Sequence, residues 1–281
     1  MIKISFSIYV IMDIYIPVFL INRKEHKKRL EKSLHELKKI NCQAIQIVQA
    51  HDGKYAREQK FLYFSSRVYK NITRGPSNTS IIPTWEAAAC ALSHIKAWKY
   101  ALESKEEIVI ICEDDITVKS TEMSTFYILE AQHVLKKNPL SIMFFNGYIK
   151  TIQGQYIFNY NSKTTFAHDN KESYSRLYNN THYCLKRSHF YMTTKTALKK
   201  MLEHNYPIEY QIDIHMSNEL RDRCELSIYN ATEDCSIFQN KKFLSTVQFY
   251  HIKNPNYLSM ILKHKLPFSV CECIVIYLTS F

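Results

Sequence analysis

The stretch Ile108-Val109-Ile110-Ile111-Cys112-Glu113-Asp114-Asp115 joins an apolar run to three consecutive carboxylates. The apolar part is typical of a buried strand, whose interior cannot hold three unpaired negative charges. We therefore expect the acidic residues to lie where the strand leaves its sheet. Ligands of open α/β sheets bind at the carboxyl ends of the strands, so this stretch predicts a strand and a ligand site together. The alternative is an ordinary acidic turn after a core strand.

Side chains alternate along an extended backbone, so Glu113 and Asp115 are expected to point the same way and Asp114 elsewhere. Two carboxylates on one side can hold a hard divalent cation. Such a cation can neutralise the negative charge of a diphosphate. The acidic residues therefore predict a metal site that binds a phosphorylated ligand.

The composition is that of a folded protein. The chain has 281 residues, 46% hydrophobic and 22% charged, which suits one large domain or two modest ones. Its net charge of +11 and pI of about 9.1 suit a phosphorylated ligand, a nucleic acid or an anionic membrane surface. Lys, Ile, Asn and Tyr are plentiful while glycine numbers only 4. An A+T-rich genome produces the same profile, so the charge does not select among these partners.

Cysteine usage points to a reducing compartment. Eight cysteines are present without a CxxC pair, and Cys271-Glu272-Cys273 alone is not a zinc signature. Several lie in apolar runs, where a free thiol packs as a small hydrophobic side chain. The even count leaves disulfides open, but the pattern favours a cytoplasmic protein.

Both ends of the chain are apolar and short. Met1 to Met12 is too short for a membrane span and has no clear signal-peptide cleavage site, so we predict that residues 1–11 are an extension. Leu266 to Phe281 falls short of the ~20 residues of a spanning helix. We expect one domain over residues 12–255 and an apolar tail over 256–281. The protein is then soluble or peripheral to a membrane.

Apolar periodicity alternates between strands and helices along the chain. Strands are predicted at 14–21, 44–50, 108–112, 141–145 and 190–193, helices at 25–39, 86–103 and 194–204, and a loop near the site at 63–83. Residues 151–180 resist assignment. Strands and helices in alternation predict an α/β fold with a mostly parallel sheet flanked by helices and right-handed crossovers.

Short segments between residues 16 and 245 stand in an order that is more specific than any one of them. They are Leu20-Ile21-Asn22 with a basic helix containing Arg29, Ala50-His51-Asp52-Gly53, Cys90-Ala91-Leu92-Ser93-His94, Glu113-Asp114-Asp115, Asn146-Gly147, Tyr191 with the Ala197 to Leu202 helix, Pro207 with Asp213, and Phe238-Gln239 with Ser245. In this order they resemble glycosyltransferase family 25, the lipooligosaccharide and collagen galactosyltransferase group.

The resemblance implies a GT-A-like, Rossmann-like fold with a nucleotide-sugar at the carboxyl edge of the sheet. It implies an inverting transfer of a hexose, galactose from UDP-galactose, to a glycan, a lipid-linked acceptor or a hydroxylated protein. Mn²⁺ or Mg²⁺ held by Asp115, with Glu113 directly or through water, would offset the charge on the leaving nucleoside diphosphate. Asp114 would contact the ribose or support the metal ligands.

The other candidate residues each keep more than one interpretation. His94 and Ser93 lie within the second predicted helix. His94 is a candidate catalytic residue that contacts the donor or its phosphates, and Ser93 is a candidate donor-binding residue. The alternative for both is a structural role. Asp213 is the general base that an inverting transfer needs, a further metal ligand, or a helix cap. Asn22 contacts the nucleotide or caps the first helix, and we assign Arg29 a structural role on that helix.

Two other classes of function compete with this one. The family's Gly-Glu-x-Gly-Cys segment is here Trp85-Glu86-Ala87-Ala88-Ala89-Cys90, without its glycines. This departure leaves open a catalytically inactive sugar- or nucleotide-binding protein that retains the fold. A nucleic-acid-binding protein is disfavoured, because the Lys residues scatter instead of interleaving with stacking aromatic side chains.

Overall fold

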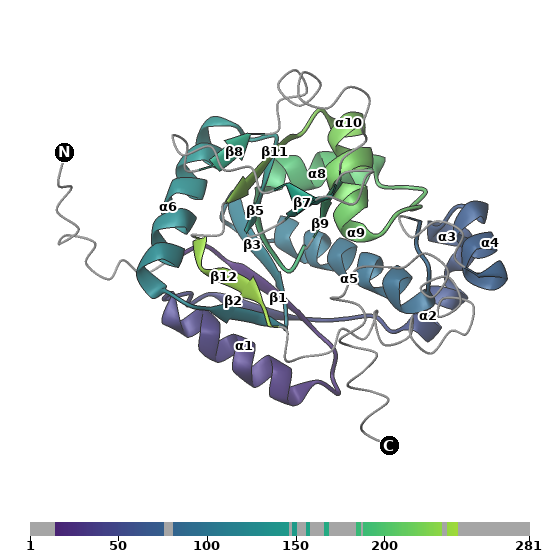
Figure 1. Cartoon of the computed structure of the whole chain (residues 1–281), viewed down its shortest axis with the longest axis horizontal. Coiled ribbons are helices and arrows are strands. Elements are labelled where there is room, and N and C mark those ends of the chain that lie inside the picture. Colours follow the sequence, from purple (N-terminus) through teal and green to yellow (C-terminus); the bar gives the residue numbers. More distant parts are fainter. Residues whose placement is uncertain are drawn as a thin grey trace.

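The computed structural model describes residues 15–75, 81–145, 148–150, 156–157, 166–168, 184–186, 188–231 and 235–240. Within these residues the central element is a seven-stranded sheet in the order β2-β1-β3-β10-β5-β11-β8 (Figure 1). Its strands are β1 (Val18–Asn22), β2 (Ile45–Gln49), β3 (Ile108–Glu113), β5 (Ser141–Phe145), β8 (Phe166–His168), β10 (Phe190–Thr194) and β11 (Ser227–Ala231). Five strands run the same way and β10 and β8 are reversed, which confirms a mostly parallel sheet.

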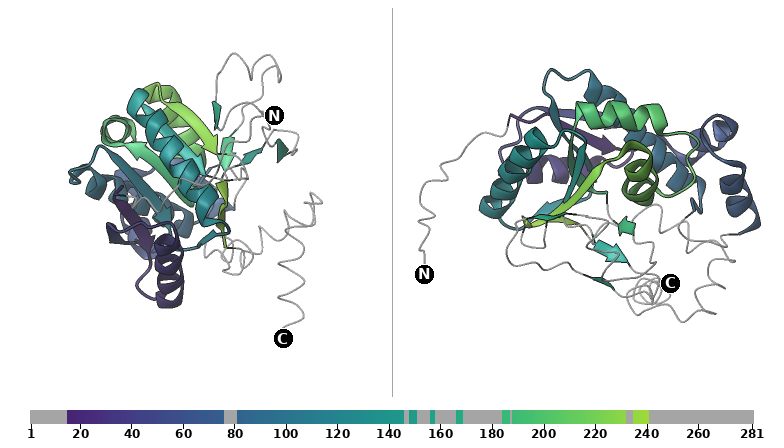
Figure 2. Two further views of the ribbon diagram at one scale, coloured as in Figure 1. Left: turned by 90° about the vertical axis from the view of Figure 1, so that its left-hand side faces the viewer. Right: turned by 90° about the horizontal axis from the view of Figure 1, so that it is seen from above.

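Helices cover both faces of this sheet (Figures 1 and 2). The helices α5 (Trp85–Leu102) and α8 (Lys195–His204) pack on one face, and α1 (Lys27–Lys39) and α6 (Thr121–Lys137) pack on the other. In β3, Val109 and Ile111 belong to the first core, while Ile110 and Cys112 belong to the second. Because both of its faces are covered, β3 is a continuous apolar run, which is why the sequence pattern identifies it.

The two helices that carry the first core begin at side-chain caps. Thr84 Oγ1 accepts a hydrogen bond from the backbone N–H of Ala87 at the start of α5, and Thr194 caps α8 in the same way. The small side chains of α5 allow it to be buried along most of its length. The helices predicted at 86–103 and 194–204 are confirmed, although Leu102 and Leu202 are only partly buried.

Two parts of the fold differ from the sequence-based expectation. The predicted loop at 63–83 is wrong over much of its length, because α4 (Ser66–Arg74) lies there and follows α2 (Gly53–Glu58) and α3 (Lys60–Tyr63). In α4 only Val68 and Asn71 are buried, so its apolar periodicity is weak. The helix α6 was left unassigned, although its buried Tyr127, Ile128, Ala131 and Leu135 follow helical spacing.

Smaller elements complete the described part of the chain. They are β4 (Ile116–Val118) paired with β12 (Ile237–Gln239), the three-stranded sheet of β7 (Tyr156–Ile157), β6 (Tyr148–Lys150) and β9 (Cys184–Lys186), and the run of α9 (Ile212–Ile214), a π-helix (His215–Leu220) and α10 (Arg221–Cys224). The strand β12 contains Phe238 and Gln239, which the family resemblance singled out. Its pairing with β4 brings it beside the segment that follows the acidic motif.

Several expectations fall outside the described residues. These are the extension at 1–11, the tail at 256–281 and hence the limits of the 12–255 domain, together with Asn146-Gly147 and Ser245. The cysteines with described side chains, Cys42, Cys90, Cys112, Cys224 and Cys235, are free thiols. No helix in the described part of the chain is long and apolar enough to cross a membrane.

Candidate active site

A pocket lies at the carboxyl ends of β1, β2 and β3, between the first turns of α1 and the first half of α5. Parallel strands bring their carboxyl ends to one edge of the sheet, so residues distant in sequence meet there. Most of the site residues predicted from the sequence line this pocket: Asn22, Ser93, His94, Glu113, Asp114 and Asp115. Asp213 is not among the lining residues.

The acidic motif spans the last residue of β3 and the turn that follows it. The chain turns at Asp114 and Asp115, between β3 and β4. Arg29 Nη2 lies 2.5 Å from Asp114 Oδ1 and 3.5 Å from Asp115 Oδ2, so both carboxylates reach the same guanidinium. Their other partners differ, because Asp114 accepts a hydrogen bond from Asn22 and Asp115 accepts one from Gln239.

Asp114 is held by side chains from β1 and α1. Its Oδ2 accepts a hydrogen bond of 2.6 Å from Asn22 Nδ2, and its Oδ1 pairs with Arg29. Burial raises the pKa of Asp114, and the Arg29 charge and the Asn22 hydrogen bond oppose that rise. The side chain of Arg29 is mostly buried against the acidic motif, so its contact with Asp114 is compatible with the structural role expected for it.

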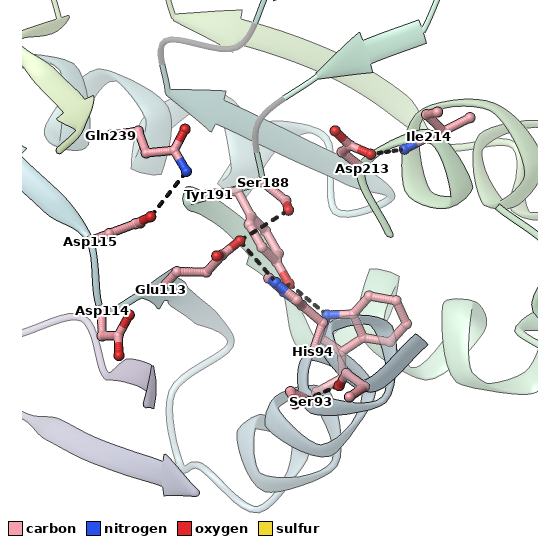
Figure 3. A network of polar contacts seen from close by, with 12 residues as sticks. Ser93, His94, Glu113, Asp114, Asp115, Ser188, Tyr191, Asp213, Ile214 and Gln239 are labelled. Atoms are coloured by element: carbon pink, nitrogen blue, oxygen red, sulfur yellow. Dashed lines mark hydrogen bonds and ion pairs between the residues drawn. The ribbon is translucent and has the colours of Figure 1, made fainter. Parts of the chain in front are cut away.

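Asp115 is 2% exposed, and only one of its two carboxylate oxygens accepts a hydrogen bond from the described residues. Its Oδ2 accepts a 3.0 Å hydrogen bond from Gln239 Nε2 (Figure 3), while its Oδ1 is buried and has no hydrogen-bond partner among the described residues. Burial, followed by the charge of Glu113, raises the pKa of Asp115 to about 7. A buried carboxylate oxygen without a donor, beside a second carboxylate, fits a divalent cation.

Glu113 ends β3 and faces α5. Its Oε1 lies 3.4 Å from His94 Nε2 and 3.4 Å from Ser188 Oγ (Figure 3). Burial opposes ionisation of Glu113, but the hydrogen bond from His94 and the charges around the carboxylate, that of Arg29 among them, outweigh burial, so the pKa of Glu113 is below its ordinary value. Its carboxylate is therefore anionic at neutral pH and remains partly open to the pocket.

A chain of hydrogen bonds behind Glu113 sets the tautomer of His94. Trp98 Nε1 donates to the Tyr191 hydroxyl at 2.7 Å, and that hydroxyl lies 3.1 Å from His94 Nδ1 (Figure 3). Burial raises the pKa of Tyr191, so the phenol keeps its proton. Among the described residues Nδ1 is the acceptor within reach of that proton. His94 then carries its own proton on Nε2, directed at Glu113.

Cys90, His94 and Glu113 form a cluster whose candidate ligand atoms lie within 4.8 Å of one another. These residue types also occur in zinc sites. Burial and the neighbouring carboxylates raise the pKa of the Cys90 thiol. The His94–Glu113 contact is the hydrogen bond within the cluster. We interpret the cluster as a hydrogen-bonded support for Glu113.

Ser93 joins α5 to the turn after β2. Its Oγ donates to the backbone oxygen of Ala89 at 2.7 Å and accepts from the backbone N–H of His51 at 2.9 Å. In the same turn, a Cβ on Gly53 would lie 2.5 Å from Glu86 Oε1, so a side chain here would displace the Glu86 carboxylate. Ser93 fixes one wall of the pocket, which Gly53 also lines.

Asp213 lies on α9, which packs against α5. Its Oδ1 accepts a hydrogen bond of 2.9 Å from the backbone N–H of Ile214 (Figure 3). The side chain is partly exposed. Its charge also contributes to the raised pKa of Cys90, which lines the pocket. Asp213 is therefore near the α5 side of the pocket and apart from the residues that line it.

Sequence analysis missed several side chains of the site. Tyr191 was noted for its place in the family pattern without a role, and Trp98 and Ser188 were not noted. A signal existed for Trp98, which lies one helical turn after His94 on a predicted helix. Gln239 belonged to the weakest segment of the resemblance, yet it is the residue that binds Asp115.

Comparison with known protein families identifies the family of this chain. A sequence model of glycosyltransferase family 25, described as an LPS biosynthesis protein, matches residues 15–216. The match covers most of the chain and supports a glycosyltransferase role. The chain belongs to glycosyltransferase family 25.

Two solved structures show distant likeness to this chain. Mannose-1-phosphate geranyltransferase from Thermus thermophilus matches with 11% identity and a TM-score of 0.38, covering 77% of this chain and 73% of that one. Mannose-6-phosphate isomerase from Helicobacter pylori matches with 14% identity and a TM-score of 0.31, covering 79% and 88%. A search of curated proteins gave no match. Neither structural likeness bears on the function of this chain.

Proposed function

We propose that this protein is a metal-dependent hexosyltransferase with a GT-A-like fold, which moves galactose from UDP-galactose to a sugar or hydroxylated acceptor. The observation that carries the proposal is the Oδ1 atom of Asp115, buried without a hydrogen-bond partner among the described residues at the carboxyl end of β3. Asp115 lines the pocket, so a cation bound there would complete this atom. Membership of family 25 supports the class of reaction.

Glu113 and Asp115 are the residues that would hold Mn²⁺ or Mg²⁺. When bound, the cation would supply positive charge that stabilises the leaving nucleoside diphosphate. Hard divalent cations prefer carboxylate oxygens, and both residues offer one toward the pocket. His94 would keep Glu113 in place through Nε2, so we assign it a positioning role rather than direct contact with the donor.

Donor binding is assigned to the β1 side of the pocket. Asn22 and Arg29 hold Asp114 there, and Arg23 and His26 also line the pocket. These donors and cations suit the phosphates and ribose of a nucleotide. Ser93 would act by fixing the His51 backbone at the opposite wall.

The acceptor side is assigned to α9. Asp213 is the proposed general base, because an inverting transfer needs a carboxylate near the acceptor hydroxyl. The acceptor would be a glycan, a lipid-linked glycan or a hydroxylated protein, handled in the cytoplasm or at a membrane surface.

A donor screen tests this proposal. Release of nucleotide from UDP-, GDP- and CMP-sugars is measured with Mn²⁺, with Mg²⁺ and with EDTA, with a mixture of glycan acceptors and without one. We expect release from UDP-galactose with Mn²⁺ and none with EDTA. Equal release in EDTA would contradict the metal assignment. Binding of UDP-galactose without release under any condition would instead identify an inactive sugar- or nucleotide-binding protein.

A further inference from the structure

Exposed apolar side chains gather at α3 and α4. Large hydrophobic side chains that are exposed in the described part of the chain are Tyr15, Ile47, Phe61, Leu62, Tyr69 and Tyr206. Four of these, Phe61, Leu62, Tyr69 and Tyr206, lie on or beside α3 and α4, and we name them the α3–α4 patch. Phe61 is 86% exposed and Leu62 is 66% exposed. A gathering of this kind on a folded chain marks an interaction surface.

The side chains of the patch contact neighbouring residues of the folded chain. Lys60 Nζ lies 4.9 Å from the ring centre of Phe61 and 5.1 Å from that of Tyr69, so one cation bridges two exposed rings. The ring of Tyr206 lies 5.3 Å from that of Tyr63. Beneath them, Val68 of α4 is part of the first core. The exposed rings are therefore presented by packed helices.

Tertiary contacts tie this region to the segment before α9. Phe64 forms a parallel β-bridge with Ile208, and Arg67 pairs with Glu209 at 2.6 Å. Figure 1 places α3 and α4 at one end of the molecule, opposite α6, and the view from above in Figure 2 agrees. The patch thus has a fixed position relative to the rest of the fold.

The charge around the patch is strongly positive. Residues 53–75 contain six basic side chains and one acidic side chain. Four of the basic side chains, Lys54, Arg57, Lys70 and Arg74, are exposed, and Arg67 is exposed but paired with Glu209. Helices with exposed apolar tips and a surround of Lys and Arg bind the interface of anionic bilayers, where burial of the tips and attraction to lipid phosphates add.

We propose that the α3–α4 patch docks this protein on an anionic lipid bilayer. Phe61 and Leu62 enter the boundary between headgroups and acyl chains, and the tyrosines stay at the headgroup level, where their rings and hydroxyls are both solvated favourably. The basic side chains contact lipid phosphates. A second copy of this chain is a poorer occupant, because two surfaces of the same positive sign repel each other.

Docking would also place the pocket near the membrane. The turn of Asp52 and Gly53 lines the pocket and begins α2, and α2 leads directly into α3. One short helix therefore separates the patch from the pocket. The proposal does not depend on the reaction, since lipid binding can be measured without a donor or an acceptor.

Co-sedimentation of the full chain with vesicles tests the proposal. Vesicles of phosphatidylcholine alone are compared with vesicles that also contain phosphatidylglycerol. We expect binding to the anionic vesicles, weaker binding at high salt and little to the neutral ones. Phe61→Ser with Leu62→Ser should lower the partition coefficient by roughly tenfold or more, because two apolar side chains no longer leave water.

Two matched controls test whether loss of an exposed apolar side chain or reversal of exposed charges elsewhere in the protein also lowers vesicle binding. Ile47→Ser removes an exposed apolar side chain on β2, and Lys136→Glu with Lys137→Glu reverses two exposed charges on α6, at the opposite end. A third variant, Lys70→Glu with Arg74→Glu on α4, should lower vesicle binding. Neither control should lower binding as much as this variant or the patch variant. Melting temperatures check that each variant is folded.

Three outcomes would overturn the proposal. One is absence of binding to the anionic vesicles. Another is equal partition of the patch variant and the wild-type chain, which would place the contact elsewhere in the molecule. The third is a dimer in analytical ultracentrifugation that dissociates in Phe61→Ser with Leu62→Ser, which would assign the patch to self-association. A selective loss of binding in the patch and α4 variants supports it.

Discussion

The Tyr191 hydroxyl lies 3.1 Å from Nδ1 of His94, and these residues are 97 positions apart in the chain. The contact joins the reversed strand β10 to α5, and His94 joins both to Glu113 at the end of β3. The orientation of one carboxylate in the pocket therefore depends on a phenol hydroxyl at the centre of the sheet.

Replacing Tyr191 by Phe should destabilise the protein and weaken metal-dependent turnover. The substitution leaves Trp98 Nε1 and His94 Nδ1 buried without their partner, which costs about 1–3 kcal/mol of unfolding free energy. Urea denaturation measures that loss. Tyr100→Phe, on the same helix as His94 but partly exposed, should change stability by less than about 0.5 kcal/mol. An unchanged free energy for Tyr191→Phe would show that the hydrogen bonds are absent in solution.

Asp115→Asn should abolish transfer without loss of stability. The substitution keeps the shape of the side chain and removes a buried negative charge beside Glu113, the charge whose burial raises the pKa of Asp115 to about 7. The melting temperature should therefore stay equal or rise, while nucleotide release is lost. Asp222→Asn, at an exposed position, is the control for both measurements. Full activity of Asp115→Asn in EDTA would remove Asp115 from the metal site.

Arg29→Met should cost about 3 kcal/mol of unfolding free energy, because it leaves Asp114 buried without its cation. The matched change Arg223→Met breaks a more exposed ion pair with Glu219 and should cost less than about 0.5 kcal/mol. Chemical denaturation of both variants measures the difference. Equal costs would show that the Arg29 pair is as solvated as a surface pair.

Asp213→Asn should lower turnover by about 10² to 10⁴, the range expected for loss of a general base. Donor affinity should stay the same, because the base acts on the acceptor in the transition state. Steady-state kinetics measures turnover, and calorimetry measures donor affinity. Weaker donor binding with partial rescue by Mn²⁺ would indicate a metal ligand. Normal turnover with a loss of about 1 kcal/mol would indicate that Asp213 only stabilises the start of α9.

Stability should fall as pH drops from about 6.5 toward 4, and His215 should account for part of the fall. His215 is fully buried, its Nε2 lies 3.1 Å from the Asn205 backbone oxygen, and burial lowers the pKa of His215 from 6.5 to about 4. The unfolded chain therefore binds this proton at a higher pH than the folded chain, so acid favours unfolding. The full effect is at most about 3 kcal/mol.

His215→Gln retains a donor toward Asn205 and cannot titrate, so its stability should vary less between pH 6.5 and pH 4. His133→Gln, at an exposed position on α6, should follow the wild-type pH profile. Urea denaturation at several pH values measures the slopes. Identical slopes for His215→Gln and the wild-type chain would show that another group titrates.

Much of the fold could be predicted from the sequence because its signals are local. The strand β3 and the helix α5 were found from an apolar run and from apolar spacing, and the acidic motif from its charge. The same reasoning failed for α4, which buries only Val68 and Asn71 and so shows little periodicity.

The candidate site was predicted as a set of residues but not as an arrangement. The family resemblance selected Asn22, His94 and the acidic motif as site residues. In the structure these residues line one pocket. The positions of Arg29 and Gln239 on the carboxylates depend on packing of distant elements. Local spacing holds no information on such contacts, which is why the sequence did not reveal the support of Asp114 and Asp115.

The reversed strand β10 also constrains how the protein is made. Tyr191 pairs with Ile111, so one edge of β3 stays without its neighbour while the ribosome synthesises the intervening chain. An apolar edge with free backbone N–H and C=O groups pairs readily with other chains. Pairings of such long sequence separation also form slowly. A nascent chain released before Phe190–Thr194 is complete would expose this edge permanently, so we expect truncation before β10 to favour aggregation.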